Sequence, residues 1–297
     1  MVNKSALFRL HFIVFLWGFT AILGKLINAN AQILVFYRMF FAAFFLFIFI
    51  RFFQRQGLKI SKKLFFQLAA IGGFMAFHWL FFFHSIKVSN VSIALSCLSL
   101  STLFASVLEP LIFKRKIDIS EVIMGIVIVI CMGLIFKTEF HYKEGIFYGV
   151  LTALFGTIFS VFNGKIFGKT SSGNIIFYEI FSGLMILSVF YLFTGQIFQL
   201  NEISYRDLAL ILILASIFTA FPMLESVKLM KYISPFTLIL TVNLEPVYGI
   251  ILAFFIFGES EQMSPVFYIA SFIMIMAIIA NGVIKQRKAA TKKVEAE

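Results

Sequence analysis

Apolar stretches of about 20 residues recur along the whole chain and are separated by short polar connections. At about 1.5 Å per residue, a helix of that length crosses a hydrocarbon layer of roughly 30 Å. The runs are continuous, whereas a membrane β-barrel requires segments of about ten residues with alternating polarity. A span in lipid must satisfy its own backbone hydrogen bonds, so each run is expected to be a helix. The pattern predicts ten spans, at residues 7–28, 32–53, 64–86, 91–113, 118–136, 145–167, 173–194, 207–229, 235–257 and 264–284.

The composition supports this interpretation. Hydrophobic residues make up 61% of the 297 positions and charged residues only 13%. An ordinary soluble domain has about 25% charged residues, so a soluble globular protein is excluded.

The net charge of +11 raises the question of nucleic-acid binding, and the placement of the basic residues answers it. With the N-terminus in the cytoplasm, 19 of the 25 Lys and Arg residues fall in inner segments and 4 in outer loops. This asymmetry is the positive-inside signal of membrane proteins. The basic residues therefore orient the chain with both termini in the cytoplasm, and we expect no nucleic-acid partner.

Segments far apart in the chain resemble each other. ILVFYRMFF at 33–41 resembles NIIFYEIFS at 174–182, and KIDISEV at 116–122 resembles SEQMSPV at 260–266. The offsets of 141 and 144 residues match spans one to five with spans six to ten. Because each unit has an odd number of helices, the second unit must enter the membrane from the opposite side. The alternative is that apolar helices resemble each other by composition alone.

The predicted fold is an all-α integral membrane protein with ten transmembrane helices in two inverted five-helix repeats. The first repeat covers residues 1–142, the second covers residues 143–288, and residues 289–297 form a charged cytoplasmic tail. In such a fold, exchanging the conformations of the two repeats opens a central site to one side and then to the other.

Glu245 lies about ten residues into a predicted span of 23, close to the membrane midplane. An ionisable residue there costs roughly 2.5–3.5 kcal/mol, so it needs a partner or a wet cavity. Pro246 lacks an amide and frees a carbonyl near Val242, while Asn243 adds a polar group at the same depth. We interpret this stretch as a substrate site or hinge. The alternative is a kinked packing helix.

Arg38 lies about six residues from the outer end of span two. Glu179 lies about six residues from the inner end of span seven, so the two charges differ in depth by on the order of 10 Å and a direct pair is disfavoured. The guanidinium needs another acceptor, which could be a carbonyl, Glu245 or a substrate carboxylate. The alternative is that its long side chain extends to the outer headgroups.

Two ring side chains also lie deep in their spans. His78 lies past the middle of span three, where a histidine could carry a proton near neutral pH or could pack with a satisfied hydrogen bond. Trp17 lies near the middle of span one, too deep for the interfacial aromatic belt, so it either packs or stacks on a substrate. Convergence of Glu245, Arg38 and His78 on one cavity would favour a transport mechanism.

Span four carries small polar side chains along one helix face, namely Ser92, Ser96, Ser99 and Ser106, with Thr102 beside them. This stripe either lines a pathway or permits close helix contact.

In span six, Gly145, Gly149 and Ala153 predict a close helix contact. Asn163, late in the same span, has an amide that could bind either a ligand or a backbone carbonyl.

Two other acids, Glu109 and Glu225, lie near inner span ends, and Lys228 follows Glu225 at the i+3 position. We expect both to be interfacial. Cys97 and Cys131 lie inside spans without metal-ligand spacing, so neither a metal site nor a disulfide is predicted.

Some of these segments resemble a known family. WGFTAILGK at 17–25, Arg38, and LEPVYGIILAFFIFGE at 244–259 resemble the EamA-type repeats of the drug/metabolite transporter superfamily, and the likeness covers nearly the whole chain. The chain departs from the family pattern at Thr102, where proline is usual, and at Lys114 and Arg115, where Gly and Glu would be expected. The residues that match the pattern individually are Trp17, Gly18, Lys25, Arg38, Pro246, Gly258 and Glu259.

The resemblance implies ten helices, cytoplasmic termini, a bacterial inner-membrane location, and transport or export of small metabolites such as amino acids without an ATP site or cofactor. We therefore predict a secondary transporter that exports its substrate by alternating access, with proton coupling left open. We predict no enzymatic activity. The alternative is a membrane-embedded enzyme acting on a lipid-linked substrate, which usually shows clustered acid–base or metal-binding residues.

The expected partners are a small-molecule substrate and the lipid bilayer, and a homodimer is left open. The residues predicted to line the substrate pathway are Glu245, Arg38, His78, Trp17, Asn163, Ser99, Thr102, Asn243 and Tyr248. The predicted helix breaks or hinges are Pro246, Pro222 and Gly18.

Overall fold

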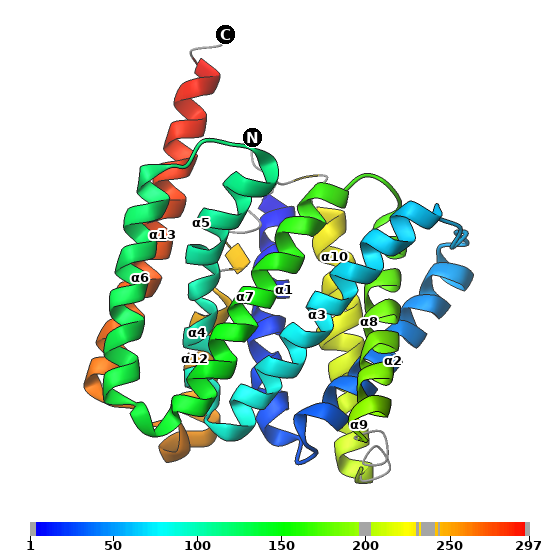
Figure 1. Ribbon diagram of the computed structural model, residues 1–297, viewed down its shortest axis with the longest axis horizontal. Helices are drawn as coiled ribbons and strands as arrows, with labels where there is room; N and C mark the ends of the chain where they lie inside the picture. Colours follow the sequence, from blue (N-terminus) through cyan, green and yellow to red (C-terminus); the bar gives the residue numbers. More distant parts are fainter. Residues whose placement is uncertain (1–3, 196–202, 230–231, 233–240, 243, 295–297) are drawn as a thin grey trace.

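The computed structural model describes residues 4–195, 203–229, 232, 241–242 and 244–294, and every regular element among these residues is helical (Figure 1). In chain order the elements are α1 (Lys4–Leu26), α2 (Ala31–Ile48), η1 (Phe49–Phe53), α3 (Lys62–Val88), α4 (Val91–Leu98), α5 (Leu100–Phe113), α6 (Ile119–Thr138), η2 (Phe140–Tyr142), α7 (Lys143–Ile166), α8 (Ser172–Thr194), α9 (Tyr205–Ala215), η4 (Ser216–Ala220), α10 (Phe221–Leu229), α12 (Glu245–Phe257), η5 (Gly258–Glu261) and α13 (Pro265–Val294).

Eight of the predicted spans are confirmed as helices long and apolar enough to cross a membrane. α12 and the apolar stretch Pro265–Asn281 of α13 lie in the ninth and tenth predicted spans but are shorter. Much of the ninth span before α12, including residues 235–240 and Asn243, lies outside the described residues. The predicted tail at 289–297 continues α13 as a helix up to Val294.

Polar side chains begin most of these helices. Asn30 Oδ1 accepts the Ile33 amide at 2.8 Å before α2, and Asn90 Oδ1 accepts the Ile93 amide at 2.8 Å before α4. Ser61, Ser171 and Ser204 begin α3, α8 and α9 in the same way. Such N-caps satisfy amides that have no partner within the helix, so the short connections define where the spans begin.

The two halves of the chain run in opposite directions through the bundle. α1 begins and α13 ends at the same end, whereas α7, the first long helix after residue 142, begins at the opposite end (Figure 1). This is the arrangement expected of inverted repeats. α3 packs along both α7 and α8, α1 packs along α12, and α6 pairs with α13 at one side of the bundle.

A positive φ angle recurs with the spacing of the predicted repeat, although ψ differs, at 36° for Lys114 and −124° for Gly258. Lys114 follows α5 with φ 53°, and Gly258 follows α12 with φ 55°, 144 residues later. Positive φ favours glycine, so Lys114 occupies a position where the sequence comparison expected Gly. Arg115, the other departure, forms ion pairs with Glu109 at 3.0 Å and Glu121 at 2.8 Å. The sequence did not indicate this partner for Glu109, and its interfacial position stays a prediction.

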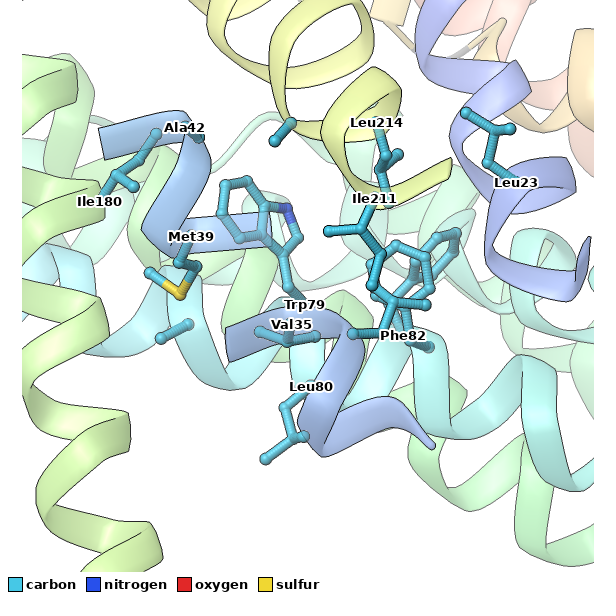
Figure 2. Packing of buried hydrophobic residues seen from close by; sticks show 14 of the residues in the cluster. Leu23, Val35, Met39, Ala42, Trp79, Leu80, Phe82, Ile180, Ile211 and Leu214 are labelled. Atoms are coloured by element: carbon cyan, nitrogen blue, oxygen red, sulfur yellow. The ribbon is translucent and has the colours of Figure 1, made fainter. Parts of the chain in front are cut away.

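A buried apolar cluster joins α1, α2, α3, α8 and α9. Figure 2 shows the Trp79 side chain of α3 among Val35 and Met39 of α2 and Ile211 and Leu214 of α9. The cluster therefore joins helices of both repeats around α3.

The predicted close contact of span six is confirmed. A Cβ added at Gly145 would lie 2.2 Å from Ser89 Oγ, and one at Gly149 would lie 2.7 Å from Cys97 Sγ. α7 thus packs directly against the ends of α3 and α4, where only glycine leaves enough room.

Candidate functional site

Arg38 is held inside the bundle. It is only 3% exposed, and its Nε donates a hydrogen bond to Thr219 Oγ1 at 2.9 Å. Its guanidinium carbon lies 4.0 Å from the centre of the Trp79 ring and 5.3 Å from that of Phe83. Cation–π contacts of this kind attract a guanidinium to an aromatic face. The alternative that Arg38 extends to the outer headgroups is wrong, because its charge lies within the protein.

Thr219 lies in a π-helical segment, η4, which interrupts the span formed by α9 and α10. Its hydroxyl donates to Leu214 O at 2.7 Å, five residues earlier, and therefore offers a lone pair to Arg38. π-Helical turns are rare and occur frequently at functional sites. Pro222, a predicted hinge, lies just after η4 and cannot donate an amide to the preceding turn.

Glu245 is the first residue of α12, and Pro246 follows in the first turn. A missing amide is tolerated there, since the first amides of a helix have no intrahelical acceptor. The predicted break therefore coincides with the start of a helix. The Glu245 carboxylate and the Arg38 guanidinium interact electrostatically, but no direct ion pair joins them in the described part of the chain.

His78 points toward another helix. Its Nδ1 lies 2.8 Å from the Thr152 carbonyl oxygen of α7, so this nitrogen must carry the proton. The absence of a side chain at Gly156 permits the approach, because a Cβ there would lie 2.7 Å from Nδ1. His78 also packs against Phe159, with ring centres 5.6 Å apart. Although it interacts electrostatically with Arg38, its ring packs against α7, as the packing interpretation expects.

Trp17, Gly18 and Tyr248 lie where α1 meets α12. Trp17 packs with Tyr248 in a small apolar cluster, and the Tyr248 hydroxyl lies 3.3 Å from His11 Nδ1. A Cβ at Gly18 would lie 3.3 Å from the Glu245 carbonyl oxygen. Gly18, predicted as a hinge, is therefore placed at a close helix crossing beside Glu245.

The serines along one face of span four contact different partners. Ser92 Oγ donates to Glu261 at 2.8 Å, and Ser96 Oγ lies 3.4 Å from Ser271 Oγ. Ser99 lies at the junction of α4 and α5, and Thr102 Oγ1 is buried without a hydrogen-bond partner in the described residues.

Asn163 forms a hydrogen bond with Glu179, a contact that the sequence did not predict. Its Nδ2 donates to Glu179 Oε2 at 3.2 Å, and Glu179 is fully buried. The expectation that Glu179 does not pair with Arg38 agrees with this contact. Asn163 therefore lies with Glu179 between α7 and α8 rather than with the groups around Arg38.

The sequence missed the ion pair at the C-terminal end of α1. Lys25 Nζ lies 2.7 Å from Glu261 Oε1, and Glu261 also accepts the Val91 and Ser92 amides at 3.0 and 2.9 Å. Glu261, not the exposed Glu259 of the family pattern, is the buried acid here. A signal that could have found it is the second acid two residues after Glu259.

At the other end of α1, Arg9 forms an ion pair with Glu225, and Lys228 Nζ lies 3.7 Å from the same carboxylate. The contact with Lys228 is the i+3 contact that the sequence predicted, whereas the interfacial position of Glu225 stays a prediction. A cleft of about 270 Å³ opens here between α1 and α10, lined by Arg9, Phe12, Ile13, Phe221 and Glu225.

The structure thus brings Arg38 and Glu245 into electrostatic range, with Trp79 and Thr219 against Arg38. His78 and Asn163 instead form hydrogen bonds with Thr152 and Glu179. Asn243 lies outside the described residues. None of the predicted pathway residues lines the cleft at Arg9. Among the described residues, no group of three or more His, Cys, Asp or Glu side chains could hold a metal ion.

Comparison with known proteins gives two findings. The model of the EamA-like transporter family matches residues 5–137 and 143–283, one copy on each predicted repeat. A crystal structure described only as "Crystal structure of protein" is similar with a TM-score of 0.63 and 14% identity, over 95% of this chain and 98% of that chain. At this identity the likeness shows the fold alone. A search of curated proteins gave no match.

Proposed function

Because the chain belongs to the EamA-like transporter family, we propose that it is a secondary transporter that exports small metabolites such as amino acids by alternating access. The observation that carries this proposal is the position of Arg38, which belongs to the first repeat and is bonded to Thr219 of the second. Glu245, within electrostatic range, also belongs to the second repeat. Transporters with inverted repeats place their substrate site at the repeat interface. An enzyme is not proposed, because the family is one of transporters.

Alternating access requires contacts that open on one side while others close. α1 supplies such contacts at both ends, through Lys25 with Glu261 and through Arg9 with Glu225. Both acids belong to the second repeat, so each pair bridges the two halves. In this conformation Arg38 is enclosed, and a substrate reaches it only when the helices separate.

We expect Glu245→Gln to reduce substrate flux in proteoliposomes and to change its dependence on an imposed pH gradient. The substitution keeps the size of the side chain but removes the titratable group close to Arg38. The measurement is counterflow of a panel of labelled amino acids with and without the gradient. Glu259→Gln, at an exposed acid just after α12, is the matched control and should leave flux unchanged. Unchanged flux and pH dependence in Glu245→Gln would remove this residue from any coupling role.

The proposed topology has ten crossings with both termini in the cytoplasm. Labelling of introduced cysteines with a membrane-impermeant maleimide on intact cells tests it, because Cys97 and Cys131 are buried and should react little. Ser5→Cys and Ala296→Cys should stay unlabelled until the membrane is permeabilised, whereas Lys143→Cys should react at once. Labelling of one terminus alone would disprove the inverted arrangement.

A further inference from the structure

Arg38 has more hydrogen-bonding capacity than the described protein groups use. A guanidinium carries five N–H donors, and the structure pairs Nε with Thr219. Nη1 is buried and has no hydrogen-bond partner among the described residues. An unpaired buried donor on a charged group is costly, so such a group usually has a ligand or a counter-ion.

The surroundings hold the guanidinium of Arg38 in place. Trp79 and Phe83 lie against the guanidinium, and the Thr219 hydroxyl holds Nε from the opposite repeat. Trp79 is 7% exposed and Thr219 is fully buried, so both groups are themselves held by packing. A guanidinium fixed in this way loses little further freedom when it binds a planar anion.

The neighbouring charge restricts what the anion can be. Glu245 is close enough to Arg38 for their charges to influence each other, but no ion pair joins them among the described residues. A second negative charge alone would be repelled by Glu245, whereas a ligand that also carries a positive group would be attracted by both residues.

We propose that Arg38 is the carboxylate-binding residue of the substrate site, with Nη1 as the open donor, and that its ligand is a zwitterion whose cationic group faces Glu245. This inference rests on the proposed transport function and specifies the group that the site recognises. A guanidinium–carboxylate contact is charge-assisted and directional, so it discriminates strongly against an uncharged amide.

Because Trp17 is itself a predicted pathway residue, the wild-type chain is titrated in parallel with a Trp17→Phe variant, in which Trp79 is the sole tryptophan and reports on Arg38. Both proteins, as full chains in detergent, are titrated with L-alanine, L-threonine and L-leucine, with their carboxamides, and with 4-methylpentanoate. We expect saturable changes in Trp79 emission with the amino acids. The carboxamides should bind at least about tenfold more weakly, which corresponds to about 1.4 kcal/mol, and 4-methylpentanoate should also bind more weakly than leucine.

Arg38→Gln in the same background should abolish the response, and Arg38→Lys should weaken it, because lysine keeps the charge but lacks the planar fork. The matched control is Arg206→Gln at an exposed arginine of α9, which should respond like the parent. Equal affinity for leucine and leucinamide, or no response to any amino acid, would overturn the proposal. These ligand comparisons use intact Arg38 and so do not depend on whether an Arg38 variant folds.

The same ligands separate this inference from the transport proposal. If amino acids change Trp79 emission through Arg38 but show no flux in proteoliposomes, the carboxylate site stands and transport fails. If leucine and leucinamide are transported at equal rates, transport stands and the role of Arg38 is overturned.

Discussion

Replacing Glu261 by alanine is expected to lower the free energy of unfolding by about 3–5 kcal/mol, the range for removing one partner of a buried ion pair. The carboxylate is 1% exposed and accepts hydrogen bonds from the Val91 and Ser92 amides, the Ser92 hydroxyl and Lys25. Alanine would leave the Val91 and Ser92 amides at the start of α4 without this acceptor. Thermal unfolding of the full chain in detergent measures the loss.

The isosteric Glu261→Gln substitution tests the geometry of this contact. The two backbone amides bond to different carboxylate oxygens, and glutamine converts one of those oxygens into a donor that faces an N–H group. We expect a loss of about 1–3 kcal/mol. Glu259→Gln should change stability by less than about 0.5 kcal/mol, as usual for an exposed site. A Glu261→Gln protein as stable as the wild type would show that these bonds contribute little.

The second large effect is expected for Gly72→Ala, at the crossing of α3 and α8. A Cβ at Gly72 would lie 2.2 Å from the Glu179 carbonyl oxygen, and one at Gly183 would lie 2.5 Å from the Gly72 carbonyl oxygen. Backbone atoms cannot rotate away as a side chain can, so one methyl group must separate the helices. We expect a loss of about 1–3 kcal/mol or more, as for overpacking of a core.

Displacement of α3 should also disturb Trp79, which lies seven residues after Gly72 on the same helix and packs against Arg38. Thermal unfolding and Trp79 emission in the Trp17→Phe background measure both consequences. Gly133→Ala is the control, because a Cβ there meets no atom within 4 Å. It should be neutral or stabilising by up to about 1 kcal/mol, the helix-propensity difference between alanine and glycine. Equal stability of the Gly72→Ala and Gly133→Ala proteins would contradict the close contact.

Contacts within one helix could be predicted from the sequence. Lys228 follows Glu225 by three residues, and the structure places their charges 3.7 Å apart, because helical geometry alone brings such positions together. The same carboxylate also pairs with Arg9 on α1, more than 200 residues away in sequence. No local pattern indicated that second partner.

The surroundings of Arg38 show the same division. Its depth indicated that it needs an acceptor, but the acceptor is Thr219, 181 residues away in an irregular turn. A threonine in an apolar span has no feature that distinguishes it from the many others. His78 shows the opposite case, since its depth suggested a functional group and the structure directs its ring to the Thr152 carbonyl of α7.

By itself, the sequence determined that this protein is a helical membrane protein of two repeated units. A span in lipid must satisfy its own backbone hydrogen bonds, so the length of an apolar run is enough to predict a helix. The resemblance between the two halves of the sequence indicated the repeat. The sequence also determined which charged residues lie deep enough to need partners. Only the tertiary structure decided which partners those are, as for Glu261 with Lys25 and for Arg38 with Thr219. The physical reason is that contacts between helices depend on how close two backbones can approach and where each side chain then points, and neither property is encoded locally.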